Sequence, residues 1–385
     1  MKSKVFRALS VLIILSVLFS FVSCGKTPGK APGIGKKGVA KENIKIGMIY
    51  NYQPANDKIF DAYHRDGIEA AAKELSIDTK QIISKSIKGS DGKTPEAVMR
   101  EALKEGCNVI FALSQEDQDA CEKLAAEYPD VKFLCYASTK HNDKNFGSFF
   151  AKMYEAEFLA GIAAGTKSKA NSVCFIAPAG KTDSEVTLSV NGFVRGVIVS
   201  NPNVKPYIYV AETDKYWFDL GTEANNAKYA ITKSKCDVIA QYAGTSITPN
   251  TAAESKVFSL GFGTDMTSTA ENYFMFSPVW NWNVYYKKVL GDIINGSFST
   301  APYLGGIKEG VVGISKLNEK ACGDAVVKAV NSYIEKFKSD EGYDIFSVEI
   351  KDSFFEQKLP ADKDYTYEQL VSGIDYYIFG TDEIF

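Results

Sequence analysis

Short apolar runs alternate with longer amphipathic stretches from Ile44 onward, a pattern typical of strands alternating with helices. Strands are predicted at 44–50, 81–87, 108–113, 131–137 and 148–152. Helices are predicted at about 57–75, 95–105, 117–128 and 154–166. Apolar strands joined by helices predict a parallel sheet with helices on both faces.

A second series of the same kind starts at Ser172. Its strands are predicted at 172–177, 206–212, 237–243 and 256–262, and its helices near 184–199, 220–234 and 250–255. Two series of similar length predict an α/β protein with two doubly wound parallel-sheet lobes. Because ligands of such sheets bind beyond the carboxyl ends of the strands, six segments are candidate site loops: 51–57, 114–117, 137–143, 178–184, 242–248 and 263–266.

The first 23 residues have the pattern of a secretory signal peptide. Three basic residues precede the apolar run 8–22, which at 15 residues is shorter than the ~20 that a membrane-spanning helix needs. The cysteine at position 24 resembles the one that ends a bacterial lipobox, although Phe21 departs from the usual Leu, Val or Ile. We therefore expect lipidation of Cys24 and a location on the extracytoplasmic face of the cell membrane. A plain signal peptide with an incidental cysteine is the alternative.

Residues 24–43 are expected to form a flexible tether behind that lipid. Positions 25–43 hold five Gly, two Pro and five Lys with almost nothing to bury, and a coil of this length reaches on the order of 25 Å. Gly33, Gly35 and Gly38 match a dinucleotide-binding fingerprint in spacing. Since no strand precedes them and no helix follows, the match carries no function.

Charge and composition exclude several function classes. Removal of residues 1–23 takes the formal net charge from -3 to -6, which argues against nucleic acid as a partner. Neither histidine, His64 or His141, lies in a metal-ligand spacing, and no nucleophile motif is present. The sequence therefore predicts no metal, no cofactor and no enzyme activity, and His64 is expected at the surface.

Six cysteines remain beyond Cys24, and they are scattered: Cys107, Cys121, Cys135, Cys174, Cys236 and Cys322. No CxxC pair indicates a metal site. Cys135 and Cys174 fall inside predicted strands, where a cysteine is usually a small buried hydrophobe. The sequence leaves open whether one or two disulfides form.

An aromatic cluster at 274–298 is the strongest candidate for ligand binding. Trp280 and Trp282 flank Asn281 where an extended segment gives way to a helix with Tyr285, Val289 and Ile293 on one face. Aromatic planes with an amide between them suit a flat heterocycle, which they could sandwich while the amide reads its edge. Burial of both indoles in the core is the alternative.

Several motifs resemble, in order, those of the basic membrane protein family of ABC-transporter substrate-binding lipoproteins, which includes purine nucleoside receptors. They are Asn-Asp-Lys-Ile-Phe at 56–60, the turn at 127–133, Tyr-Glu-Ala-Glu-Phe-Leu-Ala-Gly at 154–161, and the segments 191–196, 236–239 and 260–265. The run Val-Trp-Asn-Trp at 279–282 and the C-terminal Tyr-Tyr pair resemble a subgroup whose ligands are purine-like.

The resemblance implies the periplasmic-binding-protein type I architecture, with a ligand cleft between hinged lobes. It implies that Phe60 stacks on a purine and that Asn56 or Asp57 binds its polar edge, although Asn56 could equally cap a helix. Asp265 would bind ribose hydroxyls. Gly263 replaces a family aspartate, which favours a free base over a nucleoside. Trp280 and Trp282 would supply the opposing stack or the pocket wall.

The expected N-terminal lobe comprises residues 44–150 and 279–298, and the expected C-terminal lobe comprises 151–278 and 299–318. Crossings after 150, near 278 and near 298 would form the hinge. A helix at 319–339 and a tail to 385 would pack on one lobe. The resemblance implies a monomer that closes on a purine nucleoside or base and delivers it to an ABC permease.

Three other functions remain open at this point. A sugar receptor of the same architecture would share the fold. A signalling or adhesion lipoprotein would bind a partner without feeding a permease. A nucleosidase would convert its purine ligand, whereas a receptor would return it unchanged.

Overall fold

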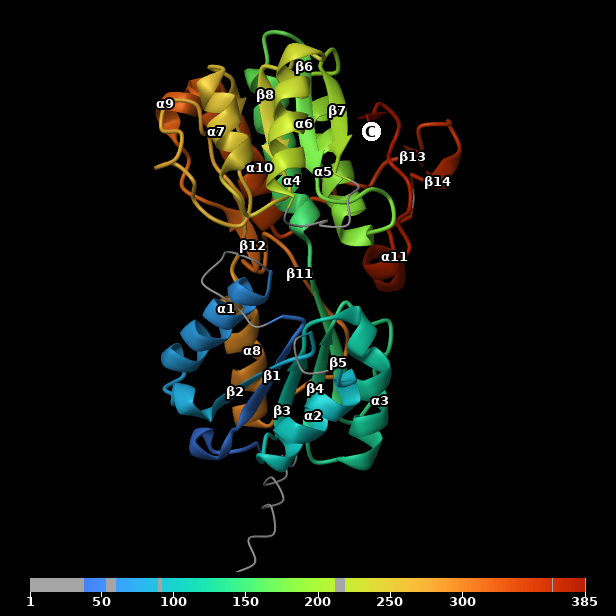
Figure 1. The fold of residues 1–385 in the computed structure, drawn as a ribbon. Coiled ribbons are helices and arrows are strands. Elements are labelled where there is room, and N and C mark those ends of the chain that lie inside the picture. The colour runs from blue at the N-terminus through green and yellow to red at the C-terminus, as the bar shows by residue number, and fades with distance from the viewer. Residues whose placement is uncertain (1–37, 53–59, 89–91, 212–218, 362, 385) are drawn as a thin grey trace, which may run out of the picture.

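The structure is a computed structural model that describes residues 38–52, 60–88, 92–211, 219–361 and 363–384. It has two α/β lobes, one above the other, joined by several crossings of the chain (Figure 1). Within the described ranges, every helix is too short or too polar to span a bilayer.

The first lobe is built on a six-stranded parallel sheet with the order β11-β5-β4-β3-β1-β2. Its strands are β1 (Ile46–Tyr50), β2 (Ile82–Ser86), β3 (Val109–Ala112), β4 (Lys132–Tyr136), β5 (Phe146–Ala151) and β11 (Tyr303–Gly305). Short 3₁₀ turns lie at Lys41–Asn43, Thr79–Gln81 and Gln115–Asp117.

Helices cover both faces of this sheet because its strands are apolar on both sides. On one face, Met48 and Phe111 belong to the core that includes α1 (Phe60–Glu74) and α8 (Trp282–Asn295). On the other face, Ile49 and Ile110 contribute to the core that includes α2 (Pro95–Lys104) and α3 (Gln118–Glu127). The lobe therefore has the doubly wound form that the sequence predicts.

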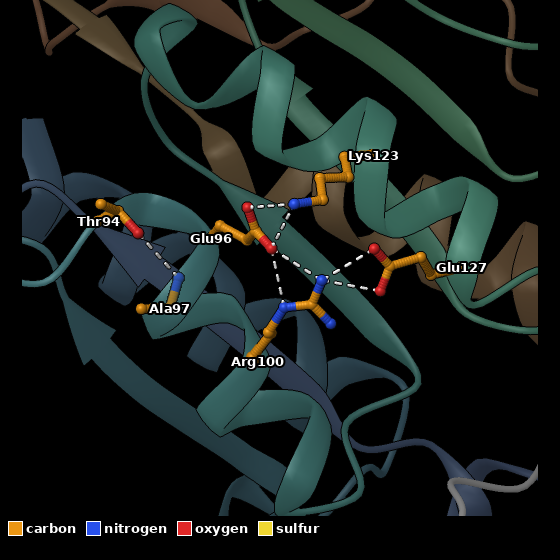
Figure 2. Close-up of polar contacts among 6 residues, drawn as sticks. All are labelled: Thr94, Glu96, Ala97, Arg100, Lys123 and Glu127. Carbon is orange, nitrogen blue, oxygen red and sulfur yellow. Dashed lines mark hydrogen bonds and ion pairs between the residues drawn. The ribbon is translucent and has the colours of Figure 1, made fainter.

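Charged side chains join α2 to α3 on the outside of the first lobe (Figure 2). The Arg100 guanidinium lies 2.7 Å from Glu96 and 2.8 Å from Glu127, and the Lys123 ammonium lies 2.9 Å from Glu96. The Thr94 hydroxyl accepts the Ala97 N–H and caps α2. The network fixes the two helices relative to each other on the side away from α1 and α8.

The second lobe has a five-stranded parallel sheet with the order β15-β7-β6-β8-β9. Its strands are β6 (Ser172–Ala177), β7 (Lys205–Val210), β8 (Val238–Gln241), β9 (Phe258–Ser259) and β15 (Asp382–Ile384). One face packs on α4 (Met153–Lys167) and α5 (Ser184–Ser200), and α10 (Asp324–Lys338) packs on α4. The other packs on α6 (Leu220–Thr232) and α7 (Ile247–Glu254).

Helices α4 and α5 approach each other unusually closely inside the second lobe. A Cβ added at Gly161 of α4 would overlap with the Phe193 carbonyl oxygen, and one added at Gly196 of α5 would overlap with the Phe158 carbonyl oxygen. Only glycine leaves room for backbones this close. The resulting rigid pair carries the start of α5, which faces the first lobe.

In the part that the structure describes, the chain passes between the lobes three times. It crosses from β5 to α4, from β10 (Pro278–Trp280) to α8, and from β11 to β12 (Val312–Ile314), and β10 pairs antiparallel with β12. The third crossing comes after β11, not near 298, because β11 pairs with β5 of the first sheet. The assignment of 299–305 to the second lobe was therefore wrong.

The segment after β12 continues on the second lobe. Instead of one helix at 319–339, α9 (Glu319–Cys322) and α10 are separated at Gly323, whose φ is +75°. Then come β13 (Ile350–Lys351), β14 (Gln357–Leu359) and α11 (Tyr367–Ser372). The tail ends in β15, which pairs with β7 and so extends the second sheet.

Candidate ligand-binding cleft

A cleft of about 690 Å³ lies between the two lobes, within the size range of small-molecule sites. Its lining includes residues from five of the six candidate loops, all except 263–266: Asn51 and Tyr52, Ser114 to Glu116, Ala137, Thr182 to Ser184, and Tyr242 to Thr245. The expectation that ligands bind beyond the carboxyl ends of the strands therefore located most of the cleft from the sequence.

Aromatic rings form a nearly continuous wall across the cleft. Phe60, Tyr63 and Tyr136 come from the first lobe, while Tyr242 and Phe262 come from the second. Trp280 lies between the two groups at the end of β10, with its ring centroid 5.7 Å from that of Phe60 and 4.9 Å from that of Phe262. The cleft is thus suited to a flat, apolar-faced ligand.

The Phe60 and Trp280 rings do not face each other as parallel planes. Their interplanar angle is 80° and they meet edge to face. In this structure they are adjacent walls of one surface, not the two sides of a sandwich.

Three buried polar atoms of cleft residues have no hydrogen-bond partner within the described part of the chain: Asp61 Oδ1, Tyr63 Oη and Trp280 Nε1. The other oxygen of Asp61 accepts the Tyr52 N–H at 2.9 Å. Burial raises the pKa of Asp61 to about 6. Because an unpaired buried polar atom is costly, each of these atoms would gain a hydrogen bond from a polar ligand edge that reached it.

Glu185 links the two lobes across the cleft. The hydroxyl of Tyr136, from β4 of the first lobe, donates to Glu185 Oε2 at 2.7 Å, and that of Tyr242, in the second lobe, donates to Oε1 at 2.9 Å. Burial, followed by the nearby Asp183 carboxylate, raises the pKa of Glu185 to about 7. The carboxyl is therefore a hydrogen-bonding group of the cleft that takes up a proton more readily than an exposed glutamate does.

Gly263 lies directly against the first lobe. Its φ is +75°, and a Cβ built on it would overlap with the Tyr63 hydroxyl. The Tyr63 ring thus occupies the space in which a longer side chain at 263 would begin. An aspartate there would require Tyr63 to move.

The structure places some of the predicted site residues in the cleft and others outside it. Phe60 and Trp280 line the cleft. Asp265 is exposed, and its carboxylate accepts the Thr267 N–H at 2.9 Å. Asn281 donates to the Gly310 carbonyl at 3.1 Å, so its amide joins hinge segments.

Trp282 is buried in the first lobe, only 1 % exposed, and does not line the cleft. Asn56, Asp57 and Cys24 lie outside the described residues. Of the two predicted indole walls, the structure therefore brings one to the cleft.

His64 is fully buried, which corrects the expectation of a surface position. Its ring stacks on that of Trp282 with centroids 4.2 Å apart, and its Nδ1 lies 2.7 Å from the Tyr286 hydroxyl. Burial holds its pKa well below the usual value. Both partners come from α8, far along the chain, and they cover the face of α1 that carries His64.

Sequence reasoning missed several cleft residues. Asp61 and Tyr63 follow Phe60 in α1, and Glu185 lies one residue beyond the candidate loop 178–184. Those positions could have been included by extending each loop into the first turn of the next helix. Val371 and Ser372 of α11 also line the cleft, and no sequence signal pointed to them.

The described cysteines are all buried and unpaired. The placement of Cys135 and Cys174 in strands is confirmed. Among the described residues there is also no group of three or more His, Cys, Asp or Glu arranged to hold a metal ion.

A family model described as ABC transporter substrate-binding protein PnrA-like matches residues 44–343. The chain belongs to this family. The PnrA-like family consists of substrate-binding proteins of ABC transporters, not enzymes, and the corresponding prediction is confirmed. Its members act outside the cytoplasm in association with the membrane.

Three relatives differ in the ligands that their names state. A purine-binding protein of Brucella abortus is 25% identical over 350 residues, covering 91% of this chain and 96% of the relative. A nucleoside-binding protein of Lactococcus lactis is 26% identical and covers 54% of this chain and 58% of its own length. A putative glucose-binding protein of Haloferax volcanii is 28% identical and covers 56% and 54%.

Solved structures support the architecture. A solute-binding protein of an ABC transporter from Conexibacter woesei has a TM-score of 0.64 at 16% identity, covering 78% of this chain and 98% of that one. A solute-binding protein from Aeropyrum pernix has a TM-score of 0.58 at 20% identity, covering 78% and 88%. The predicted periplasmic-binding-protein type I fold is confirmed.

Proposed function

We propose that this protein is a lipid-anchored receptor that binds a purine base in the cleft and delivers it to an ABC importer. The observation that carries the proposal is the aromatic wall formed by Phe60, Tyr63 and Trp280 beside the unpartnered polar atoms of the same surface. A purine offers flat faces to the rings and a hydrogen-bonding edge to those atoms. The purine-binding relative of Brucella abortus, which aligns over most of both chains, supports the same ligand class.

A free base fits the cleft better than a nucleoside. Gly263 offers no side chain for a sugar, and the Tyr63 hydroxyl lies against it. Asp265, the other candidate for ribose binding, is exposed and engaged with Thr267. Ribose hydroxyls would therefore find few partners on this side of the cleft.

Ligand binding is expected to stabilise the closed arrangement of the lobes. A purine that touches Phe60 of the first lobe and Tyr242 of the second favours closure by its differential affinity for that state. The permease would recognise the closed form, and a single chain would suffice for this. Lipidation of Cys24 and the tether 24–43 would keep the receptor at the membrane surface.

Isothermal titration calorimetry on a soluble form starting after Cys24 tests the ligand. The panel is hypoxanthine and inosine, adenine and adenosine, and glucose. We expect hypoxanthine or adenine to bind more tightly than the matched nucleoside, and glucose not to bind. The absence of a binding signal with all four purines would refute the proposal. Mass spectrometry of small molecules released on denaturation would then identify the ligand.

D265N distinguishes the base from the nucleoside. Because Asp265 is exposed and faces its own loop, the variant should bind the free base as the wild type does. Asp265 would instead be assigned to ribose binding by two results together. The wild type would bind the nucleoside more tightly than the base, and D265N would lose nucleoside binding. Thermal melting checks that the variant is folded.

Cys24→Ala tests the anchor. The unsubstituted chain should fractionate with membranes and the variant should not, and mass spectrometry of the mature N-terminus should find acyl chains only in the former. Recovery of both proteins in the soluble fraction would contradict lipidation.

A sugar is the second candidate ligand, favoured by the Haloferax volcanii relative named as a putative glucose-binding protein. Asp61, Glu185 and Asn51 supply hydrogen-bonding groups to the cleft that a hexose could use. Glucose binding in the same calorimetric panel, without purine binding, would support it.

A further inference from the structure

The C-terminal part of the chain reaches the cleft although it lies beyond the residues that the family model matches. The match ends at 343, whereas Val371 and Ser372 of α11 belong to the cleft lining. In Figure 1, α11 lies at the level where the two lobes meet.

Two attachments fix this segment to the second lobe. Asn191 of α5 donates its amide to the Tyr376 carbonyl at 3.0 Å, and its amide oxygen accepts the Ile378 N–H at 3.0 Å. Asn191 is 1 % exposed, so both bonds are shielded from water and hold the tail close to α5. Further on, β15 pairs with β7 and anchors the end of the tail.

Tyr367 of α11 reaches the first lobe. The Tyr367 hydroxyl lies 2.6 Å from the hydroxyl of Ser148, a residue of β5. Ser148 is 1 % exposed and donates to the Ser138 carbonyl at 2.7 Å, so Tyr367 is the donor to Ser148. The hydrogen bond is partly buried and joins a tail fixed on one lobe to the sheet of the other.

We propose that residues 363–378 form a strap that supplies one wall of the ligand site and ties it to the first lobe. Val371 is buried in the core and sets the position of the wall, while Ser372 presents a short side chain to the cleft. The strap limits the size of the ligand at this wall. The Tyr367–Ser148 bond makes the wall complete only when the lobes are close together.

The proposal rests on the proposed function for the identity of the ligand, but the strap can also be tested without one. Its first test adds bulk to the wall. Ser372→Trp should weaken binding of hypoxanthine or adenine at least about tenfold in calorimetry. The matched control is Glu368→Trp, which adds the same ring to an exposed position of α11 outside the cleft lining and should bind as the wild type does.

Melting curves show whether both tryptophan variants fold, and the smaller Ser372→Leu replaces Ser372→Trp if the latter does not. Equal affinity of the Ser372 and Glu368 variants for hypoxanthine and adenine would overturn the assignment of α11 to the wall.

The second test removes the bond between the lobes. Tyr367→Phe should increase the radius of gyration of the ligand-free protein in small-angle X-ray scattering and weaken purine binding about two- to tenfold, as expected for one hydrogen bond. Tyr376→Phe is the control, because its hydroxyl lies 2.6 Å from that of Tyr365, within the tail. It should change neither quantity.

The scattering measurement separates the two proposals. If no purine binds the wild type but Tyr367→Phe alone opens the lobes, the ligand assignment fails and the strap stands. Identical scattering of the Tyr367 and Tyr376 variants would overturn the strap whatever the ligand is.

Discussion

Two tryptophans separated by one residue have opposite environments. Trp280, the last residue of β10, is half-buried and lines the cleft, and its indole nitrogen has no partner in the described part of the chain. Trp282, the first residue of α8, is buried and stacks on His64. Both indoles come from the same short motif, yet only the first can meet a ligand.

The change of backbone between them explains the difference. Asn281 ends the extended segment, its N–H donating to the Val311 carbonyl at 2.7 Å, and the helix begins at the next residue. The turn directs Trp282 toward α1, whereas Trp280 stays at the crossing between the lobes. Residue type and spacing therefore identify aromatic side chains but not the side of the chain on which they lie.

Trp282→Ala should give the largest effect, on stability. Loss of a large buried aromatic side chain costs about 3–5 kcal/mol of the free energy of unfolding. Urea denaturation followed by circular dichroism measures it. A variant nearly as stable as the wild type would mean that Trp282 is not part of the core.

Trp280→Ala should have a small effect on stability and a large effect on ligand affinity. Its melting temperature should stay close to that of the wild type, because the side chain is only partly buried. Purine affinity should fall on the order of tenfold or more, as for a central aromatic contact. Unchanged affinity in calorimetry, with Trp282→Ala as the stability reference, would exclude Trp280 from the binding surface.

His64 stacks on Trp282, so the interior around Trp282 can be tested through the pH dependence of the melting temperature. Its pKa is lowered in the folded state, so the unfolded chain takes up a proton more readily and the stability from neutral His64 is lost as pH falls below about 6.5. His64→Phe should therefore lose less melting temperature than the wild type between pH 7.5 and 5. Asp61 and Glu185, with raised pKa values, act in the other direction but are present in both proteins.

Equal pH dependence of the two proteins would show that His64 is accessible to protons in the folded state. That result would remove the distinction between the interior around Trp282 and the cleft around Trp280.

Arg100→Gln is the reference variant for the stability and affinity measurements and should have the smallest effect on both. The ion pairs of Arg100 with Glu96 and Glu127 are partly exposed (Figure 2), and α2 and α3 belong to a different core of the first lobe from α8. We expect the melting temperature to fall by less than about 2 °C and purine affinity to be unchanged. A larger loss would indicate that the network between α2 and α3 contributes more than an ordinary surface pair.

Much of the fold was predictable because strands and helices leave local signals. The strands β1 to β8 lie within or overlap the predicted runs, and the loops after them led to most of the cleft. The strand β11 was missed because its three residues carry little pattern, and its place in the first sheet depends on pairing with β5.

The site was less predictable because its composition depends on contacts between distant segments. His64 looked like a surface residue among polar neighbours, but α8 covers it. Ser372 reaches the cleft only because the tail is fixed on α5 by Asn191. Glu185 gained its role from two tyrosines of different lobes. No local sequence pattern encodes such contacts between distant segments.

The buried thiols of the described chain have a practical consequence. Because none is exposed, a maleimide dye should react selectively with a cysteine introduced at the rim, and the exposed cleft residue Thr182 offers such a position. A fluorophore there would sense lobe movement directly. The soluble form could then serve as an optical biosensor for its own cargo, without prior removal of native cysteines.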